Sequence, residues 1–270
     1  RDLVKRAGVA GFYGCVFPES VGGTDMGYVA AAVVSEELAR NDVRFAACNN
    51  QQGSTCPVCI YMGGTPEQVM KFVPPLLAGE TIGMMSLTES GGGSDPIANM
   101  KTTARRDGDT YRINGSKMWA SMANETDVGV LLAKTDPDAG AKGISAFIVE
   151  PKKYPGFEAR PIEMIGLSKA LRTNEVSLDD FVVPVENRLG EEGDGLKIVM
   201  RALQPGRVTV AAKALGVARA CFEEAVRYAN ERELRGQPIG KFQMIQSDIA
   251  EMAVAIEASR ALVYRAAQFM

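Results

Sequence analysis

The sequence contains no histidine. This absence excludes Ser-His-Asp triads, zinc sites with histidine ligands and a histidine general base. Any reaction carried out by this chain must therefore use carboxylates, hydroxyls, amides and arginines, or a bound cofactor. We predict no metal site.

Cysteine is also scarce, with five residues among 270. This number suggests no disulfide framework and predicts a reducing compartment. Cys56 and Cys59 have the C-x-x-C spacing of redox and zinc motifs. Their surroundings look helical, and a zinc site would need two further ligands. We therefore expect them to be small buried residues.

Long apolar runs are missing as well. No signal peptide and no run of eighteen apolar residues is present, so we expect neither secretion nor a membrane span. The expected location is the cytoplasm, or the mitochondrial matrix in a eukaryote. The chain starts at Arg1 without Met and ends inside a helical pattern at Met270, so we expect it to be truncated at both ends.

Charge of either sign is nearly balanced, with 30 basic and 33 acidic residues and a net charge of −3. This balance argues against a general binder of nucleic acid or membrane surfaces. The chain is 46% hydrophobic and 23% charged, which is typical of a globular protein. An anionic ligand would have to be held by local arginines and backbone amides.

The hydrophobic period changes twice along the chain. Residues 1-80 show mainly helical spacing, residues 81-190 contain short runs rich in β-branched residues, and helical spacing returns over 191-270. The Asp107-Gly108-Asp109 turn predicts a hairpin. The expected fold is α+β, with an N-terminal helical domain, a middle antiparallel β-domain and a C-terminal helical bundle.

Prolines and a heptad pattern predict where individual helices begin, are interrupted and pack against one another. Thr65 and Pro66 predict a helix start. Pro74-Pro75 is expected to interrupt that helix, and Pro205-Gly206 to kink or break a later one. The last helix carries a seam for antiparallel packing, formed by Ile245, Ile249, Met252, Ile256, Ser259, Val263 and Ala266.

The most informative stretch combines a glycine bend with the only tryptophan. Gly91-Gly92-Gly93 lies between the hydroxyls of Thr88 and Ser94, and Trp119 and Ser121 follow after a predicted strand. Bare backbone amides and a large flat ring suit a planar cofactor that carries phosphates. A polar turn and a core tryptophan are the alternative.

Acidic residues are numerous, but none is singled out as a catalytic base. Neither a Walker A loop nor a G-x-G-x-x-G motif is present, which disfavours nucleotide hydrolysis and a Rossmann-type site. Arg207 follows the Pro205-Gly206 pair, where a guanidinium could bind a phosphate. Arg232 lies at a helix end, where arginine often only complements the helix dipole.

The glycine bend and the tryptophan strand resemble the flavin-binding middle domain of acyl-CoA dehydrogenases. The matching segments are Thr88-Glu89 to Ser94-Asp95 and Asn114-Gly115-Ser116-Lys117-Met118-Trp119-Ala120-Ser121. The resemblance continues through Gly206-Arg207, Glu231-Arg232 and Phe242-Gln243, and so covers essentially the whole chain.

This resemblance implies FAD as cofactor and α,β-dehydrogenation of an acyl-CoA thioester to a 2,3-enoyl-CoA. It implies that electron-transfer flavoprotein accepts the electrons and that the chain forms a homotetramer or homodimer. The implied cofactor-binding residues are Leu87, Thr88, Gly93, Ser94, Trp119, Ala120, Ser121, Arg232 and Gln243. Of these, Arg232 and Gln243 would reach the adenosine-diphosphate half of FAD, often that of a neighbouring subunit. The implied substrate-binding residues are Ser94, Gln204 and Arg207.

The chain departs from the family pattern at three positions. Gln204 replaces an acidic residue, and Arg235 replaces the phenylalanine of an Arg-x-x-Phe-Gly motif. Gly206 occupies the position where a minority of members carry the catalytic glutamate. We therefore expect the base downstream of Met270.

The missing base leaves other functions open. The chain could be a catalytically incomplete CoA- and FAD-binding subunit of a heteromeric dehydrogenase. A desulfinase or monooxygenase on the same scaffold is also open. Several segments resemble the glutaryl-CoA branch, but its carboxylate-binding arginine has no clear counterpart, although Arg44 is near. Glutaryl-CoA is therefore not the expected substrate.

Overall fold

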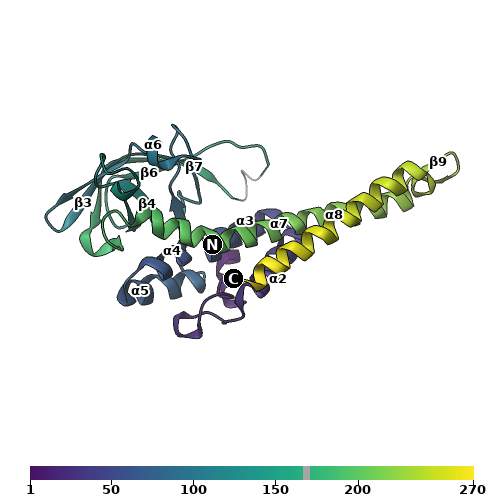
Figure 1. The fold of residues 1–270 in the computed structure, drawn as a ribbon, viewed down its shortest axis with the longest axis horizontal. Helices are drawn as coiled ribbons and strands as arrows, with labels where there is room; N and C mark the ends of the chain where they lie inside the picture. The colour runs from purple at the N-terminus through teal and green to yellow at the C-terminus, as the bar shows by residue number, and fades with distance from the viewer. Residues whose placement is uncertain (167–170) are drawn as a thin grey trace.

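The computed structural model describes residues 1–166 and 171–270. Five helices come first, and a sheet and a long helical arm follow (Figure 1). The first helices are α1 (Asp2–Val9), α2 (Gly27–Asn41), α3 (Val43–Ser54), α4 (Cys56–Gly63) and α5 (Pro66–Leu77).

Local sequence explains where these helices begin. The Asp42 carboxylate accepts hydrogen bonds from the backbone amides of Arg44 and Phe45, and so caps α3. Thr65 and Gln68 form a reciprocal capping box at the start of α5, which confirms the predicted start. The expected interruption at Pro74-Pro75 was wrong, because both prolines lie inside α5. Their turn is buried through Val73, Leu76 and Leu77, and this packing outweighs the lost backbone hydrogen bonds.

The middle segment forms a mixed eight-stranded sheet. The strand order is β6-β7-β3-β2-β4-β5-β8, with β1 paired to β4. Most neighbours are antiparallel, as predicted, but β1–β4 and β2–β4 run parallel. The strands are β1 (Gly83–Ser86), β2 (Thr103–Asp107), β3 (Thr110–Ser121), β4 (Val128–Lys134), β5 (Ile144–Val149), β6 (Phe157–Pro161), β7 (Thr173–Pro184) and β8 (Arg188–Leu189). The predicted hairpin at Gly108 joins β2 to β3.

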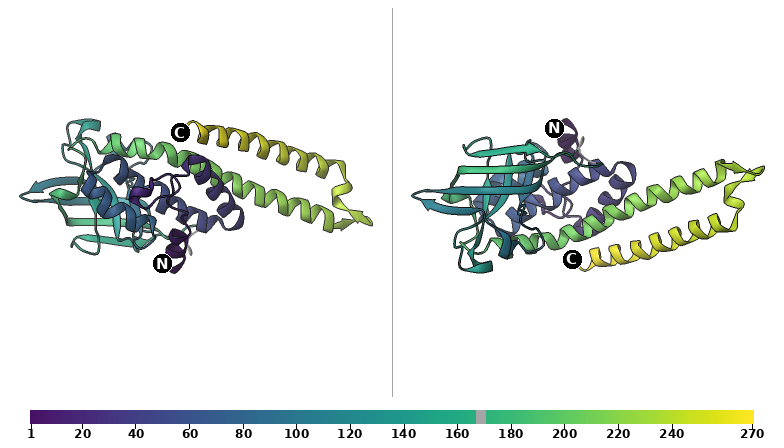
Figure 2. Two further views of the ribbon diagram at one scale, coloured as in Figure 1. Left: turned by 90° about the horizontal axis from the view of Figure 1, so that it is seen from below. Right: turned by 90° about the horizontal axis from the view of Figure 1, so that it is seen from above.

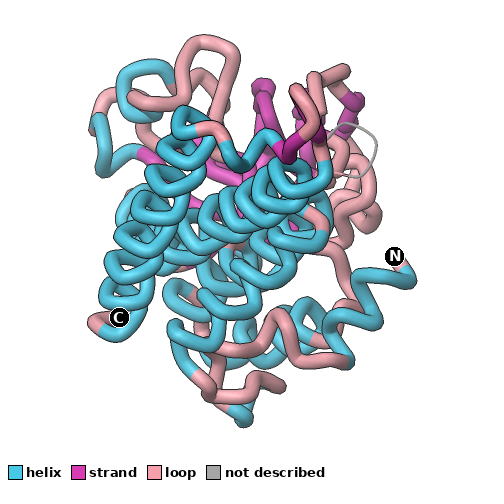
Figure 3. The backbone as a smooth tube through the Cα atoms, turned by 90° about the vertical axis from the view of Figure 1, so that its right-hand side faces the viewer, coloured by secondary structure: helices cyan, strands magenta, loops and turns pink. Residues whose placement is uncertain are grey.

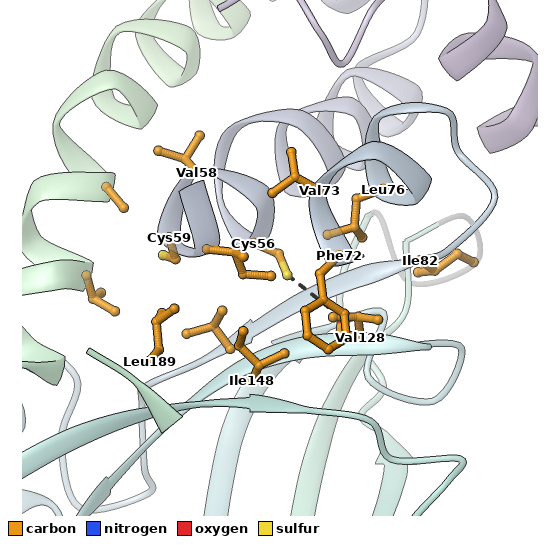
Figure 4. Close-up of a cluster of buried hydrophobic side chains, with 14 of the residues drawn as sticks. Cys56, Val58, Cys59, Phe72, Val73, Leu76, Ile82, Val128, Ile148 and Leu189 are labelled. Atoms are coloured by element: carbon orange, nitrogen blue, oxygen red, sulfur yellow. Dashed lines mark hydrogen bonds between the residues drawn. The ribbon is translucent and has the colours of Figure 1, made fainter. Parts of the chain in front are cut away.

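Helices α4 and α5 cover one face of this sheet (Figure 4). Phe72 and Leu76 from α5 and Cys56 from α4 are buried over Val128 and Ile148 of the sheet. Burying an apolar side chain of the size of leucine or phenylalanine contributes roughly 1.5–3 kcal/mol. This core fixes β1, and the glycine bend follows β1 after residues 87–90.

The C-terminal segment forms a helical hairpin that projects from the body as an arm (Figures 1 and 2). Its helices are α7 (Gly195–Glu231) and α8 (Gln243–Gln268), and the small β9 (Glu233–Leu234) and β10 (Gln237–Pro238) strands lie at its tip. Seen along the arm, the helices gather in front of the strands (Figure 3).

Of the kink or break predicted at Pro205-Gly206, the break does not occur, because α7 continues through both residues. Pro205 and Gly206 are buried, and the Thr209 hydroxyl one turn later donates to Asn50 of α3 at 2.7 Å. Packing of α7 against α2 and α3 therefore outweighs the local cost of the proline.

The heptad seam of α8 faces α7 and α2 in part. Ile256 is buried, and Ile245, Ile249, Met252 and Val263 are half-buried, as the seam predicts. Ser259 and Ala266 are exposed, and Ala267 is buried instead. A helix with 3.6 residues per turn drifts away from a strict heptad, which explains the shift by one residue.

A buried carboxylate joins the three long helices. Glu36 of α2, only 2% exposed, accepts hydrogen bonds from Arg219 of α7 at 2.7 Å and from the Tyr264 hydroxyl of α8 at 2.8 Å. Arg260 of α8 adds a third contact at 3.3 Å. Because a buried charge is costly without partners, these contacts fix how the arm joins the body.

Candidate functional site

The glycine bend and the tryptophan strand meet directly. The backbone amide of Met118 donates to the carbonyl of Thr88 at 2.8 Å. Trp119 is the next residue of β3, so its backbone lies close to the segment that follows β1 and carries the bend. The sequence suggested this pairing, and the fold brings the two segments together.

Trp119 has an unusual backbone and an exposed ring. The register between β3 and β7 shifts between Lys117 and Ala120, which makes a β-bulge. Trp119 within this bulge has φ +62, a left-handed conformation that non-glycine residues rarely adopt. Its side chain is 53% exposed. An indole held outward in a strained bulge contributes little to the core and is available to a ligand.

The bend itself needs glycine for close approach. A Cβ built on Gly93 would lie 3.0 Å from the Thr88 methyl group, and Gly92 has φ +156. Gly93 and Ser94 are exposed, and Asp95 caps the short helix α6 (Pro96–Asn99) through the Ala98 amide. The bend therefore presents bare backbone in the segment that is hydrogen-bonded to the tryptophan strand, which is the arrangement that the predicted flavin site requires.

Two clefts flank the end of β3. One, of about 520 Å³, is lined by Ser90, Ser116, Met118, Glu175, Ser177 and neighbouring residues. The other, of about 540 Å³, lies beyond Ser121 and is lined by Phe45, Cys48, Met122, Asn124, Arg172 and others. Arg44 also borders the second cleft, where its guanidinium is paired with Asp42 at 2.7 Å.

A buried ion pair lies beneath the bend, and the sequence analysis did not assign it a role. Lys117 and Glu89 are 0% and 6% exposed, with Nζ 2.7 Å from Oε1. Burial lowers the pKa of Lys117 to about 8, although Glu89 opposes this. Burial alone would raise the pKa of Glu89, but Lys117 and the Thr102 and Lys101 amides together lower it. Both groups are therefore ionised at neutral pH.

The predicted substrate residues lie on α7. Arg207 and Gln204 are both exposed, and the guanidinium of Arg207 donates to the Gln204 side chain at 2.9 Å. Neither residue makes a hydrogen bond to the glycine bend within the part of the chain that the structure describes. Gly206 between them carries no acid, and a Cβ added to it would lie 3.7 Å from the backbone carbonyl oxygen of Ser54 in α3.

The structure separates Arg232 and Gln243 from the other predicted cofactor residues. Arg232 follows the last residue of α7, and Gln243 begins α8, so both lie near the tip of the arm. The tip and the sheet lie at opposite ends of the molecule (Figures 1 and 2). These two residues therefore do not join Thr88 and Trp119 in one site of the same chain.

The C-x-x-C cysteines are buried, as predicted. Burial raises the pKa of Cys59 to about 12 and raises that of Cys56 as well, so neither thiol ionises readily. All five cysteines are free. Within residues 1–166 and 171–270, no three potential ligands gather as a metal site.

None of the described helices is both long and apolar enough to cross a bilayer.

Similarity to solved structures defines the class. A structure from work on the electron transferring flavoprotein of Acidaminococcus fermentans has a TM-score of 0.95 and 42% identity, over 99% of this chain and 70% of that one. A glutaryl-CoA dehydrogenase from Mycobacterium smegmatis in complex with FADH2 has a TM-score of 0.90 and 33% identity, over 98% and 66%. The class is that of flavin-dependent oxidoreductases.

Family models then give the family. The N-terminal, middle and C-terminal domains of acyl-CoA dehydrogenase match residues 1–80, 84–181 and 193–270. A glutaryl-CoA dehydrogenase of Desulfococcus multivorans is 42% identical over 268 residues, 98% of this chain and 68% of the relative. The chain belongs to the acyl-CoA dehydrogenase family, which confirms the fold, the oxidoreductase class and the FAD dependence predicted from sequence. It spans about two thirds of the length of these relatives.

Proposed function

We propose that the bend and the tryptophan bulge hold the isoalloxazine ring of FAD during α,β-dehydrogenation of an acyl-CoA thioester. The observation that carries this proposal is the 2.8 Å hydrogen bond from Met118 to Thr88, which joins the two segments. In this arrangement Leu87 and Thr88 meet the ring edge, and the exposed indole of Trp119 shields one face. Ala120 and Ser121 continue along the ring, and the Ser121 hydroxyl donates towards it.

The residues after Thr88 suit the charged parts of the ligands. Gly93 and Ser94 present amides and a hydroxyl without a bulky side chain, which suits phosphate or thioester oxygens. Arg207, backed by Gln204, borders the CoA pocket. Bound FAD supplies the oxidising power for removal of two electrons, and the chain supplies position, hydrogen bonds and exclusion of water.

The base that removes the α-proton remains unassigned within residues 1–270. Gly206 occupies the position on α7 where some family members carry the catalytic glutamate, and it has no carboxylate. We therefore place the base in sequence beyond Met270. A binding subunit that pairs with an active partner is the second candidate, and the departures from the family pattern at Gln204 and Arg235 are consistent with it.

The test uses the full-length protein. Purified with FAD, it should be yellow, and an acyl-CoA thioester should bleach the flavin absorption under anaerobic conditions with formation of enoyl-CoA. A protein that binds FAD but bleaches with no acyl-CoA supports the binding subunit. Uptake of oxygen or release of sulfite would identify a monooxygenase or desulfinase.

We also propose that Arg232 and Gln243 contact the FAD of a second copy, in a homodimer or homotetramer. Their place near the arm tip, far from Trp119 of the same chain, supports this assembly. FAD-loaded full-length protein that sediments as a monomer would contradict it. Electron-transfer flavoprotein is the proposed acceptor, and its reduction by enzyme and acyl-CoA tests that role.

The domain limits 1-80, 81-190 and 191-270 and a cytoplasmic location (mitochondrial matrix in a eukaryote) are further proposals. Five free thiols support a reducing compartment. Limited proteolysis near residues 80 and 190 and cell fractionation test them.

A further inference from the structure

Two opposite charges are buried directly beneath the bend. Lys117 is 0% exposed and Glu89 is 6% exposed, and their charged atoms lie 2.7 Å apart. Such a pair is expensive to desolvate, and well-packed apolar residues are often equally stable in its place. Stability of the fold alone therefore does not explain why an ion pair is buried at this position.

The pair holds three backbone segments together. The Lys117 ammonium also donates to the carbonyl of Leu87 at 3.3 Å. The Glu89 carboxylate accepts from the amides of Lys101 at 2.6 Å and Thr102 at 3.1 Å. One ion pair thus joins the end of β1, the approach to β2 and the middle of β3.

Each of these anchors is adjacent to a proposed ligand contact. Leu87 and Thr88 lie just before Glu89, and Trp119 lies two residues after Lys117. The Met118 amide that bonds to Thr88 follows Lys117 directly. The bend and the Trp119 bulge, which form the two sides of the proposed flavin site, are therefore both anchored by the Lys117–Glu89 ion pair.

We propose that Lys117 and Glu89 are positioning residues that set the distance between the bend and the Trp119 bulge, and so the placement of the flavin ring. This inference rests on the proposed function. The charges act through the backbone on either side of them and do not touch the flavin. Directional hydrogen bonds to one carbonyl and two amides fix one geometry, which an apolar core would leave free.

The test compares full-length Lys117→Met, Glu89→Gln and the double variant with the wild type. We expect each single variant to bind FAD about tenfold or more weakly, because a loosened site loses preorganised contacts. The visible absorption bands and the reduction potential of the bound flavin should shift as well. The double variant should regain thermal stability but not FAD affinity, because it removes the unpaired charge without restoring the anchors.

Glu36→Gln is the matched control. Glu36 is a buried carboxylate with an arginine partner, but it joins α2 to the arm and does not contact the bend. It should lower stability while it leaves the flavin spectrum and the FAD dissociation constant unchanged.

Wild-type FAD affinity and flavin spectrum in the double variant would overturn this inference alone, even if the single variants fail to fold. A wild-type protein that takes up no FAD would overturn the proposed function, and this inference with it.

Discussion

Trp119 shows at the scale of one residue how function can work against local preference. The backbone of Trp119, at φ +62, is strained and raises the free energy of the folded state. Because Trp119 is 53% exposed, hydrophobic burial offsets little of this cost. The β-bulge and the Met118–Thr88 hydrogen bond hold the strained residue in place. We interpret this cost as the consequence of presenting a flat ring beside bare backbone.

The Glu89 carboxylate should make stability depend on acid. Its folded-state pKa lies below the ordinary value of 4.5, so the stabilisation is complete above about 4.5 and is lost as pH falls through the lowered value. At pH 7, Glu89→Gln should lower the free energy of unfolding by about 3 kcal/mol, because Lys117 is left unpaired.

Urea unfolding of the wild type and of Glu89→Gln between about pH 7 and about pH 2 measures this effect. The gap between the two proteins should narrow once pH falls below about 4.5. A gap that stays constant over this range would show that the Glu89 carboxylate is not ionised in the folded protein.

Residue types alone pointed to the bend and the indole, because glycine runs and a single tryptophan are distinctive. They did not point to Lys117 and Glu89, since a charge on a strand is usually solvated. The burial of both charges depends on tertiary structure. The register of β3 shifts after Lys117, and the backbone at Lys101 and Thr102 covers Glu89.

At the scale of elements, the crossing of α2 and α7 depends on one small residue. A Cβ added to Gly216 would lie 2.1 Å from the backbone carbonyl of Glu36 and 2.9 Å from the Ala39 methyl group. Neither helix backbone can move without disturbing the hydrogen bonds to the Glu36 side chain. The close approach therefore requires glycine at this position.

Gly216→Ala should accordingly destabilise the protein by about 1–3 kcal/mol. Gly206→Ala in the same helix is the control, because its nearest neighbour would be 3.7 Å away and alanine favours helix by up to about 1 kcal/mol. Urea midpoints of both variants measure the contrast. Equal effects of the two substitutions would refute the close-packed crossing.

Strands and helices were largely predictable from period, capping and turn residues. The predicted hairpin at Gly108 and the Thr65 cap are confirmed. Neither proline pair ends its helix, because the buried packing of α5 and α7, which local propensity does not include, outweighs the cost of the prolines. The parallel pairs of β1 and β2 with β4 depend on how distant segments meet, and local patterns do not specify that.

At the scale of the whole molecule, the arm carries Arg232 and Gln243 away from the sheet (Figure 1). The sequence could place Arg232 at a helix end, but it could not place either residue at the far end of the molecule from Trp119. On α8, Met244, Val254 and Leu262 are 81%, 69% and 69% exposed. An arm with this much exposed apolar surface fits the proposed assembly with further copies.

The central claim is that the glycine bend and Trp119 together hold a flavin ring. It is tested most directly by the fluorescence of Trp119 in full-length protein, taken as the difference between the wild type and Trp119→Phe, before and after loading with FAD. We predict that FAD removes most of this emission, because the proposed site puts the indole in contact with the flavin. Undiminished Trp119 emission from protein with FAD bound would contradict the account.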